Sequence, residues 1–354
     1  MKKSLLALAV LGAFAGAASA QTNVTIYGVV DAGVYRTDNG VDSVTGLGSG
    51  LQSGSRIGFK GTEDLGGGLS AIFTLENGFN ADTGTLAQSD AANTRLFGRQ
   101  AWVGLQGGFG AVKLGRQYAP IRVAVESIDP FGLGLAGNAA NMFNVYGERT
   151  DNTINYTTNN FGGFVGQAAY SFGEVAGDTK TGRQIGLSGA YNNGPIRAVL
   201  AYHRQELATG AVQTGNADTI MVGGAYDFGV AKLHAAYARN DGETAAGVTS
   251  VDSDDMMIGV SAPIGAGTVL ASYTRRSNDI GTNTDSDMWA IGYTYALSKR
   301  TNFYTSYARI KNDAGARQAF GTSGFGSTTT TAGAGGVVAG EDPSTFNVGI
   351  RHTF

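Results

Sequence analysis

Residues 345–354 (TFNVGIRHTF) end the chain with an alternating pattern that decides the fold. Apolar or aromatic side chains alternate there with small or hydrophilic ones. A period of two residues is typical of a β-strand with one apolar and one polar face. A strand that ends a chain on an exposed aromatic residue, here Phe354, is unusual in a soluble fold. The pattern favours a barrel whose outer face meets lipid while its lumen holds water.

The first twenty residues predict a secretory signal peptide. Lys2 and Lys3 form a basic start, residues 5–14 an apolar stretch, and residues 18–20 (ASA) a small-residue cleavage site. An N-terminal membrane anchor is the alternative, but the apolar stretch is shorter than the roughly 20 residues that a spanning helix needs. We therefore expect residues 1–20 to be removed and residues 21–354 to form one exported domain.

The composition argues against several kinds of protein. Removing Lys2 and Lys3 from the 25 basic residues leaves 23 against 28 acidic residues, a formal charge of −5, so nucleic acid is not an expected partner. The absence of cysteine excludes disulfides, thiolate metal sites and cysteine nucleophiles. After the signal, no run of about 18 apolar residues predicts a transmembrane helix. Glycine is abundant, with 56 residues, but the 15 tyrosines and 17 phenylalanines argue against disorder.

From Val24 onward, alternating segments of about 9–13 residues are separated by two kinds of connection. Seven short turns marked by glycine, asparagine or proline alternate with eight longer hydrophilic segments, so fifteen connections join sixteen strands. We predict an all-β fold, a 16-stranded antiparallel transmembrane β-barrel with short periplasmic turns and long extracellular loops. The longer segments lie near residues 36–53, 80–92, 118–148, 174–181, 207–217, 241–253, 278–285 and 313–343.

Aromatic side chains mark both rims of the predicted barrel, as a membrane barrel requires. A soluble β-sandwich, the competing fold, gives no reason for this order. The aromatic residues come late in outgoing strands (Tyr170, Tyr202, Tyr237, Tyr273) and late in returning strands (Tyr191, Tyr226, Phe228, Tyr295, Phe354).

Basic residues gather on the strand faces that parity assigns to the lumen. Arg99 is placed on the same face as Ala101, opposite Trp102, and Arg149 on the same face as Asp151. Together these side chains would form a basic patch on one wall of the lumen. The inward basic residues come from the second strand (Arg56, Lys60), the fourth (Arg99) and the sixth (Arg149).

The third long segment, residues 118–148, is too long for a simple hairpin, and its apolar residues would let it pack inside the barrel. It carries Glu126 and Asp129, which would then face the arginines across a narrow waist. Opposed charges there would create the transverse field that ion-selective pores use. A single inward arginine is more simply a solvated lumen residue, but the joint pattern favours a charged constriction. Arg116 has the opposite parity from Lys113, so a loop contact or a subunit interface is its alternative role.

Four further stretches belong with the terminal Phe354: residues 27–33 (YGVVDAG), 55–66 (SRIGFKGTEDLG), 99–105 (RQAWVGL) and 114–118 (LGRQY). Together they resemble the Gram-negative general porins, in particular their β-proteobacterial branch. The resemblance implies an outer-membrane homotrimer of sixteen-stranded barrels, surrounded by lipid and lipopolysaccharide. It also implies that the third loop folds into each pore as an eyelet.

The resemblance also assigns roles to particular residues. It implies that Arg56, Arg99 and Arg149 line one wall of the eyelet, opposite acidic residues of the third loop. Residues 129–132 (DPFG) depart from the enterobacterial pattern PEFG, which leaves open the carboxylate that faces the arginines. The terminal Phe354 resembles the signal that the outer-membrane barrel assembly machinery reads.

We predict a passive diffusion pore for small hydrophilic solutes and ions, with no cofactor, no metal and a mild anion preference. A channel specific for a sugar or an anionic solute is the nearer alternative, because lumen aromatics such as Tyr27 and Tyr35 could stack on a sugar. An outer-membrane enzyme is the more distant one. Catalysis would depend on His203, His234 or His352, and the chain has no Gly-x-Ser-x-Gly elbow.

Overall fold

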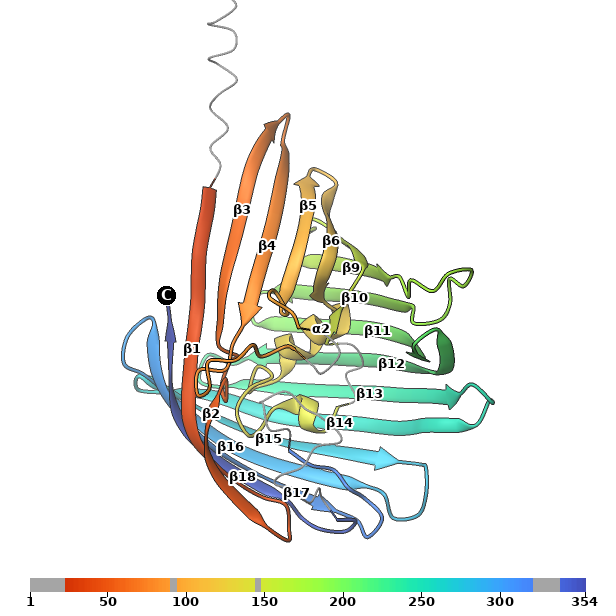
Figure 1. Ribbon diagram of the computed structural model, residues 1–354. Helices are drawn as coiled ribbons and strands as arrows, with labels where there is room; N and C mark the ends of the chain where they lie inside the picture. The colour runs from red at the N-terminus through yellow and green to blue at the C-terminus, as the bar shows by residue number, and fades with distance from the viewer. Residues whose placement is uncertain (1–22, 90–93, 144–147, 321–337) are drawn as a thin grey trace, which may run out of the picture.

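The computed structural model describes residues 23–89, 94–143, 148–320 and 338–354, so the predicted signal peptide lies outside the described residues. Its eighteen strand segments form one antiparallel sheet (Figure 1). The first segments are β1 (Asn23–Asp38), β2 (Ser43–Ser49), β3 (Arg56–Gly66), β4 (Leu69–Gly78), β5 (Gln100–Gly107), β6 (Gly110–Tyr118), β7 (Arg149–Thr150) and β8 (Thr153–Thr157). The rest are β9 (Phe164–Ser171), β10 (Gln184–Asn193), β11 (Ile196–Thr209), β12 (Val212–Asp227), β13 (Lys232–Thr244), β14 (Thr249–Ile264), β15 (Gly267–Asn278), β16 (Ser286–Ala296), β17 (Thr301–Asn312) and β18 (Ser344–Thr353).

These segments build the sixteen strands of a closed barrel, as predicted. Segments β2 and β3 pair with successive parts of β1 and are two pieces of one wall strand. Segments β7 and β8 both pair with β6 and are two pieces of one wall strand. Between them Asn152 has a φ of +52°, which interrupts the extended conformation.

The barrel closes between its first and last strands. Strand β1 pairs with β18 along one part of its length and with β3 along another. The terminal Phe354 completes this seam, because its backbone N–H and C=O each bond Gly28 at 3.1 Å. A Cβ at Gly28 would lie 2.3 Å from Cζ of the Phe354 ring, so only glycine leaves room for the aromatic side chain there.

Strand parity sorts apolar from polar side chains as predicted. In β1, Val24 and Ile26 are 54% and 60% exposed on the outer face, whereas Asp31 on the inner face is fully buried. The outer face therefore meets the surroundings with apolar groups along the strands, as in a lipid-facing barrel. Within the described ranges, no helix is both long and apolar enough to span a membrane.

Three of the predicted long loops are mostly strand, and one of them, residues 36–53, holds the end of β1 and all of β2. Residues 207–217 form the ends of β11 and β12, which pair up to Thr209 and Val212, and residues 241–253 belong largely to β13 and β14. Hydrophilic composition misled the prediction, because backbone hydrogen bonds continue a ladder even where neither face is apolar. These hairpins extend beyond the apolar part of the wall.

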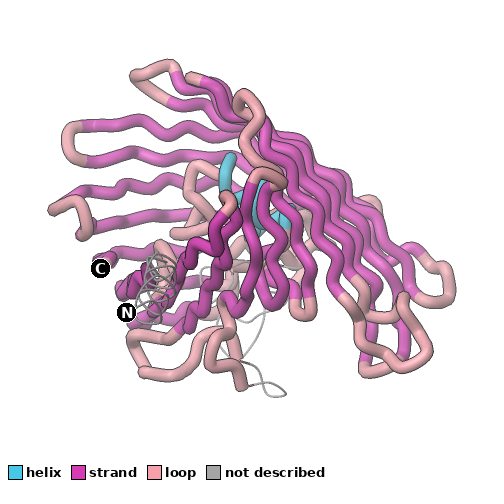
Figure 2. The backbone as a smooth tube through the Cα atoms, turned by 90° about the horizontal axis from the view of Figure 1, so that it is seen from above, coloured by secondary structure: helices cyan, strands magenta, loops and turns pink. Residues whose placement is uncertain are grey.

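The third long loop lies inside the barrel (Figure 2). It contains helix α2 (Pro120–Ile128) and the short 3-10 helix η1 (Ala139–Asn141). Proline at the first turn suits a helix start, because its missing N–H needs no partner there. The buried face of α2 packs through Ile121, Val125 and Ile128 against Val199 and Met221 of the wall.

Glycines on four returning strands give this loop its space. A Cβ at Gly223 would lie 2.5 Å from Cδ1 of Ile128, and one at Gly259 would lie 2.7 Å from Cγ of Pro130. These positions face the lumen, and a larger side chain at each would meet the loop. The glycine and loop pairs are Gly186 with Pro120, Gly223 with Ile128, Gly259 with Pro130, and Gly292 with Phe131.

Candidate functional site

Four arginines meet near Tyr118, the last residue of β6. Arg56 comes from β3, Arg99 from the residue before β5, Arg149 from β7 and Arg122 from α2. The Tyr118 ring centroid lies 4.1 Å from Cζ of Arg122, 4.8 Å from Cζ of Arg149 and 6.0 Å from Cζ of Arg99. The aromatic face favours these cations electrostatically, so Tyr118 holds guanidinium groups from the wall and from the loop together.

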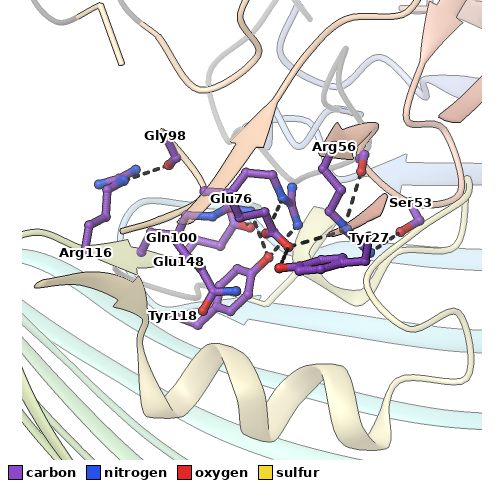
Figure 3. Close-up of polar contacts among 12 residues, drawn as sticks. Tyr27, Ser53, Arg56, Glu76, Gly98, Gln100, Arg116, Tyr118 and Glu148 are labelled. Atoms are coloured by element: carbon purple, nitrogen blue, oxygen red, sulfur yellow. Dashed lines mark hydrogen bonds and ion pairs between the residues drawn. The ribbon is translucent and has the colours of Figure 1, made fainter. Parts of the chain in front are cut away.

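Glu76 of β4 joins two of the arginines (Figure 3). Its carboxylate accepts a hydrogen bond from Arg99 Nε at 2.7 Å and another from the Tyr27 hydroxyl at 2.9 Å. Arg56 Nε lies 3.8 Å from the same carboxylate. A buried charge is tolerated only when it is paired and hydrogen-bonded, so Glu76 and Arg99 depend on each other.

The inserted loop supplies both acids and a base. Arg122 bonds Glu126 one helical turn later, and its Nε lies 3.5 Å from the Glu148 carboxylate. Glu148 also lies 2.9 Å from Arg149 Nη1. Helix α2 is therefore tied to the chain just before β7 by the contact between Arg122 and Glu148. We call Arg56, Arg99, Arg122, Arg149, Glu76, Glu126 and Glu148 the arginine–glutamate cluster.

Four positive and three negative charges leave this cluster with a net charge of +1. Five of its members, all except Glu148 and Arg149, border a cavity of about 160 Å³, which Gln52 and Ser53 also line. The side chain of Arg99 is 1% exposed and that of Arg56 is 22% exposed. Arg56 is thus more accessible to a passing ion, whereas Arg99 is enclosed by its partners.

Asp129 lies away from the arginines. Its carboxylate accepts backbone hydrogen bonds from Phe131 at 3.0 Å, Leu133 at 2.8 Å and Ala139 at 3.1 Å. Burial raises the pKa of the Asp129 carboxyl to about 6, although these three donors act in the opposite direction. The structure thus brings Glu126 to the basic wall, while Asp129 organises the turn that follows α2.

Lys60 and Arg116 also lie outside the cluster. Lys60 Nζ lies 5.3 Å from the Tyr27 ring centroid, in a cavity nearer the short turns. Arg116 points away from Tyr118 (Figure 3) and donates to the Gly98 carbonyl at 2.7 Å. Its Nη1 also donates to Asp151 at 2.6 Å, so it makes contacts between loop segments.

Strand parity was wrong at two positions beside the arginines. Trp102, not Ala101, faces the lumen, where its ring lies 4.9 Å from Lys113 Nζ. Arg99 precedes the regular part of β5, so it reaches the lumen without sharing the parity of that strand. Asp151 bonds Arg116 rather than lying beside Arg149, because β7 ends at Thr150 and Asp151 lies in the break before β8.

Sequence reasoning missed Glu76, Arg122 and Glu148 in this site. The sequence contained a pattern that could have identified Glu76 and Arg122. Glu76 has the same parity as the polar Thr74, and Arg122 with Glu126 has the four-residue spacing of a helix that starts at Pro120. No local pattern marked Glu148, which only the return of the loop to the wall brings near Arg122.

The three histidines do not converge on one site. His203 Nε2 lies 3.1 Å from Gln184 Oε1, and His352 Nδ1 lies 2.8 Å from Thr301 Oγ1. His234 Nδ1 lies 2.9 Å from the Ile128 carbonyl and anchors the end of α2. In the described part of the chain, no group of three or more histidines and carboxylates could hold a metal ion.

Known proteins resemble this chain in both sequence and fold. The model of the Gram-negative porin family matches residues 7–315. The chain belongs to this family. It is 38% identical to outer membrane porin protein 32 of Delftia acidovorans, and the alignment covers all of both chains. It is 37% identical to an outer membrane porin protein of Bordetella pertussis, over 88% of this chain and 95% of that one.

Solved structures agree with this assignment. An anion-selective porin from Comamonas acidovorans superposes with a TM-score of 0.79 at 36% identity, covering 94% of this chain and all of that one. The Salmonella typhi OmpF superposes with a TM-score of 0.66 at 19% identity, over 94% of this chain and 97% of that one, and shows the shared fold. The protein is therefore an outer-membrane porin, a general diffusion channel, and this family is not a class of enzymes.

Proposed function

We propose that the arginine–glutamate cluster is the constriction of this porin and that it gives the channel a preference for anions. The observation that carries the proposal is the excess of arginine over glutamate beside a cavity of about 160 Å³. The Nη1 atom of Arg99 is buried and has no hydrogen-bond partner among the described residues. Because this atom is enclosed, Arg99 would act on an anion through the field of the cluster, and the more exposed Arg56 would contact it directly. The anion-selective relative from Comamonas acidovorans supports the same direction.

Planar bilayer recordings test this proposal. Purified porin in a KCl gradient should give a reversal potential close to the equilibrium potential of chloride rather than that of potassium. Replacing Arg56 and Arg99 together by alanine should lower the anion preference, because the cluster would then carry a net negative charge. A reversal potential closer to the equilibrium potential of potassium would contradict the proposal. A reversal potential that is the same in the double variant would show that these arginines do not determine selectivity.

We also propose the assembly that accompanies this function. Residues 1–20 are removed as a signal peptide, and residues 21–354 assemble as a homotrimer within outer-membrane lipid and lipopolysaccharide. The barrel assembly machinery recognises the C-terminal strand, whose last residue Phe354 is 46% exposed. Electrophoresis of unheated and heated samples tests the trimer. Deletion of Phe354 should lower the amount of folded porin in the outer membrane.

A further inference from the structure

A second basic site lies on the lumen wall, on the side of the cluster that leads to the short turns. Lys60 of β3 and Lys113 of β6 line a cavity of about 870 Å³. Thr25 of β1, Thr74 of β4 and Trp102 of β5 line it as well. The volume falls within the range of about 300–1,000 Å³ that is usual for small-molecule sites. We call this cavity the lysine pocket.

The two lysines keep their charge uncompensated. Among the residues that the structure describes, none of those lining the pocket is an aspartate or a glutamate, and neither lysine has a carboxylate within 4.0 Å. Lys60 Nζ lies 5.3 Å from the Tyr27 ring centroid, and Lys113 Nζ lies 4.9 Å from the Trp102 ring centroid. An aromatic face orients an ammonium group without neutralising it. The pocket therefore carries a charge of +2, against +1 for the arginine–glutamate cluster.

The pocket also contains apolar surface, which is uncommon in a water-filled lumen. Trp102 and Ile72 both face inward and line it. Thr25, Thr74 and Gln106 supply polar groups around them. A simple inorganic anion would use the lysines and leave the apolar surface hydrated. An organic anion with a flat apolar body would use both, because its body could cover Trp102 and Ile72 while its carboxylate meets an ammonium group.

We propose that the lysine pocket is a binding site for small aromatic carboxylates on their way through the channel. The inference rests on the proposed channel function and extends it from anions in general to one class of substrate. Binding would precede or follow passage through the constriction, since the pocket and the arginine–glutamate cluster share the lumen wall formed by β3 and β4. A binding site along a channel must bind weakly enough to release its solute.

Tryptophan fluorescence gives a direct test, because the chain has two tryptophans and only Trp102 lines the pocket. Trp289 is 47% exposed on the outer face, so Trp289→Phe leaves Trp102 as the single reporter. Titration of this variant with benzoate should give a saturable change in the millimolar range. Benzamide, which has the same shape and no charge, should give a change about tenfold weaker.

Charge variants show whether the lysines are responsible. Lys60→Gln with Lys113→Gln should weaken benzoate binding about tenfold or more, and Lys113→Arg should retain it. Lys299→Gln is the matched control, because Lys299 is exposed in a short turn outside the pocket. Equal responses to benzoate and benzamide would overturn the proposal. An equal effect of Lys299→Gln would do the same.

Bilayer recordings separate the failure of this inference from failure of the channel function. In the wild type, benzoate should partly block the chloride current, and the double lysine variant should lose the block while still conducting chloride. A protein that conducts chloride with no effect of benzoate would refute the pocket and leave the channel intact. A folded protein that conducts no ions would overturn the proposed function itself.

Discussion

Removing the charge of Glu76 without changing its shape should increase the anion preference of the channel. In Glu76→Gln the amide oxygen can still accept from Arg99 Nε, now bonded at 2.7 Å, while the net charge of the cluster rises from +1 to +2. An anion that passes about 6 Å from one added unit charge gains about 0.7 kcal/mol in a water-like dielectric. This free energy corresponds to about a threefold increase in anion occupancy and a similar decrease for cations.

The opposite variant makes the test symmetrical. Arg56→Gln removes a positive charge from the more exposed arginine, whose side chain is 22% exposed, and should lower the anion preference by a similar factor. Single-channel reversal potentials in a KCl gradient measure both, at about 0.1 M salt or below, where the screening length is about 10 Å or longer. Asp42→Asn is the control, because Asp42 is an exposed carboxylate of the first long loop. Shifts of the same sign in the two cluster variants would refute the argument from net charge.

Three further changes test the loop and the barrel. Because burial raises the pKa of Asp129 from 3.8 to about 6, its protonated form stabilises the folded loop below about pH 4, and about 3 kcal/mol of this stabilisation is lost as the pH rises through 6. The protection factors of the Phe131 and Ala139 amides, which compare each exchange rate with the intrinsic rate at the same pH, should therefore be higher at pH 5 than at pH 7.5. Asp129→Asn should remove this difference in protection. Gly134→Ala would place a Cβ 2.0 Å from the Gln52 carbonyl oxygen, which should cost about 1–3 kcal/mol and speed exchange of the Leu135 amide. In Tyr304→Phe the fully buried Asp31 loses a hydrogen bond of 2.6 Å, which should cost about 1–3 kcal/mol and lower the temperature at which the barrel unfolds on a gel.

The barrel could be predicted from the sequence because its two determinants are local. Alternation in segments such as residues 345–354 sets which side chains face outward, and glycine-marked turns set where the chain reverses. The limits of β11 to β14 were misplaced, since backbone pairing continues past the apolar zone and leaves no signal in side-chain character. Loop length and apolar content were enough to predict that residues 118–148 pack inside, but not which of their carboxylates would face the arginines.

The candidate site was predicted only in part, because it depends on irregular backbone. Arg56 lies on a regular strand, and parity placed it correctly in the lumen. Parity failed for Trp102 and Asp151, which follow or precede breaks in the strands that no local pattern marked. The partner Glu148 is far from Arg122 in sequence and meets it only after the loop has folded back. Inward basic residues can thus be read from a sequence, whereas the pairs that neutralise them depend on the tertiary structure.

The selectivity of the channel depends on which basic residues have acidic partners. Four arginines at the cluster suggest a strongly positive constriction, but Glu76, Glu126 and Glu148 cancel most of that charge and fix the arginine side chains in place. Two lysines suggest a weaker site, yet they have no such partners among the described residues and carry more net charge. An ion responds to the net potential along its path and not to the number of basic residues. Anion preference in this porin should therefore fall at least as much when Lys60 and Lys113 are neutralised as when Arg56 alone is.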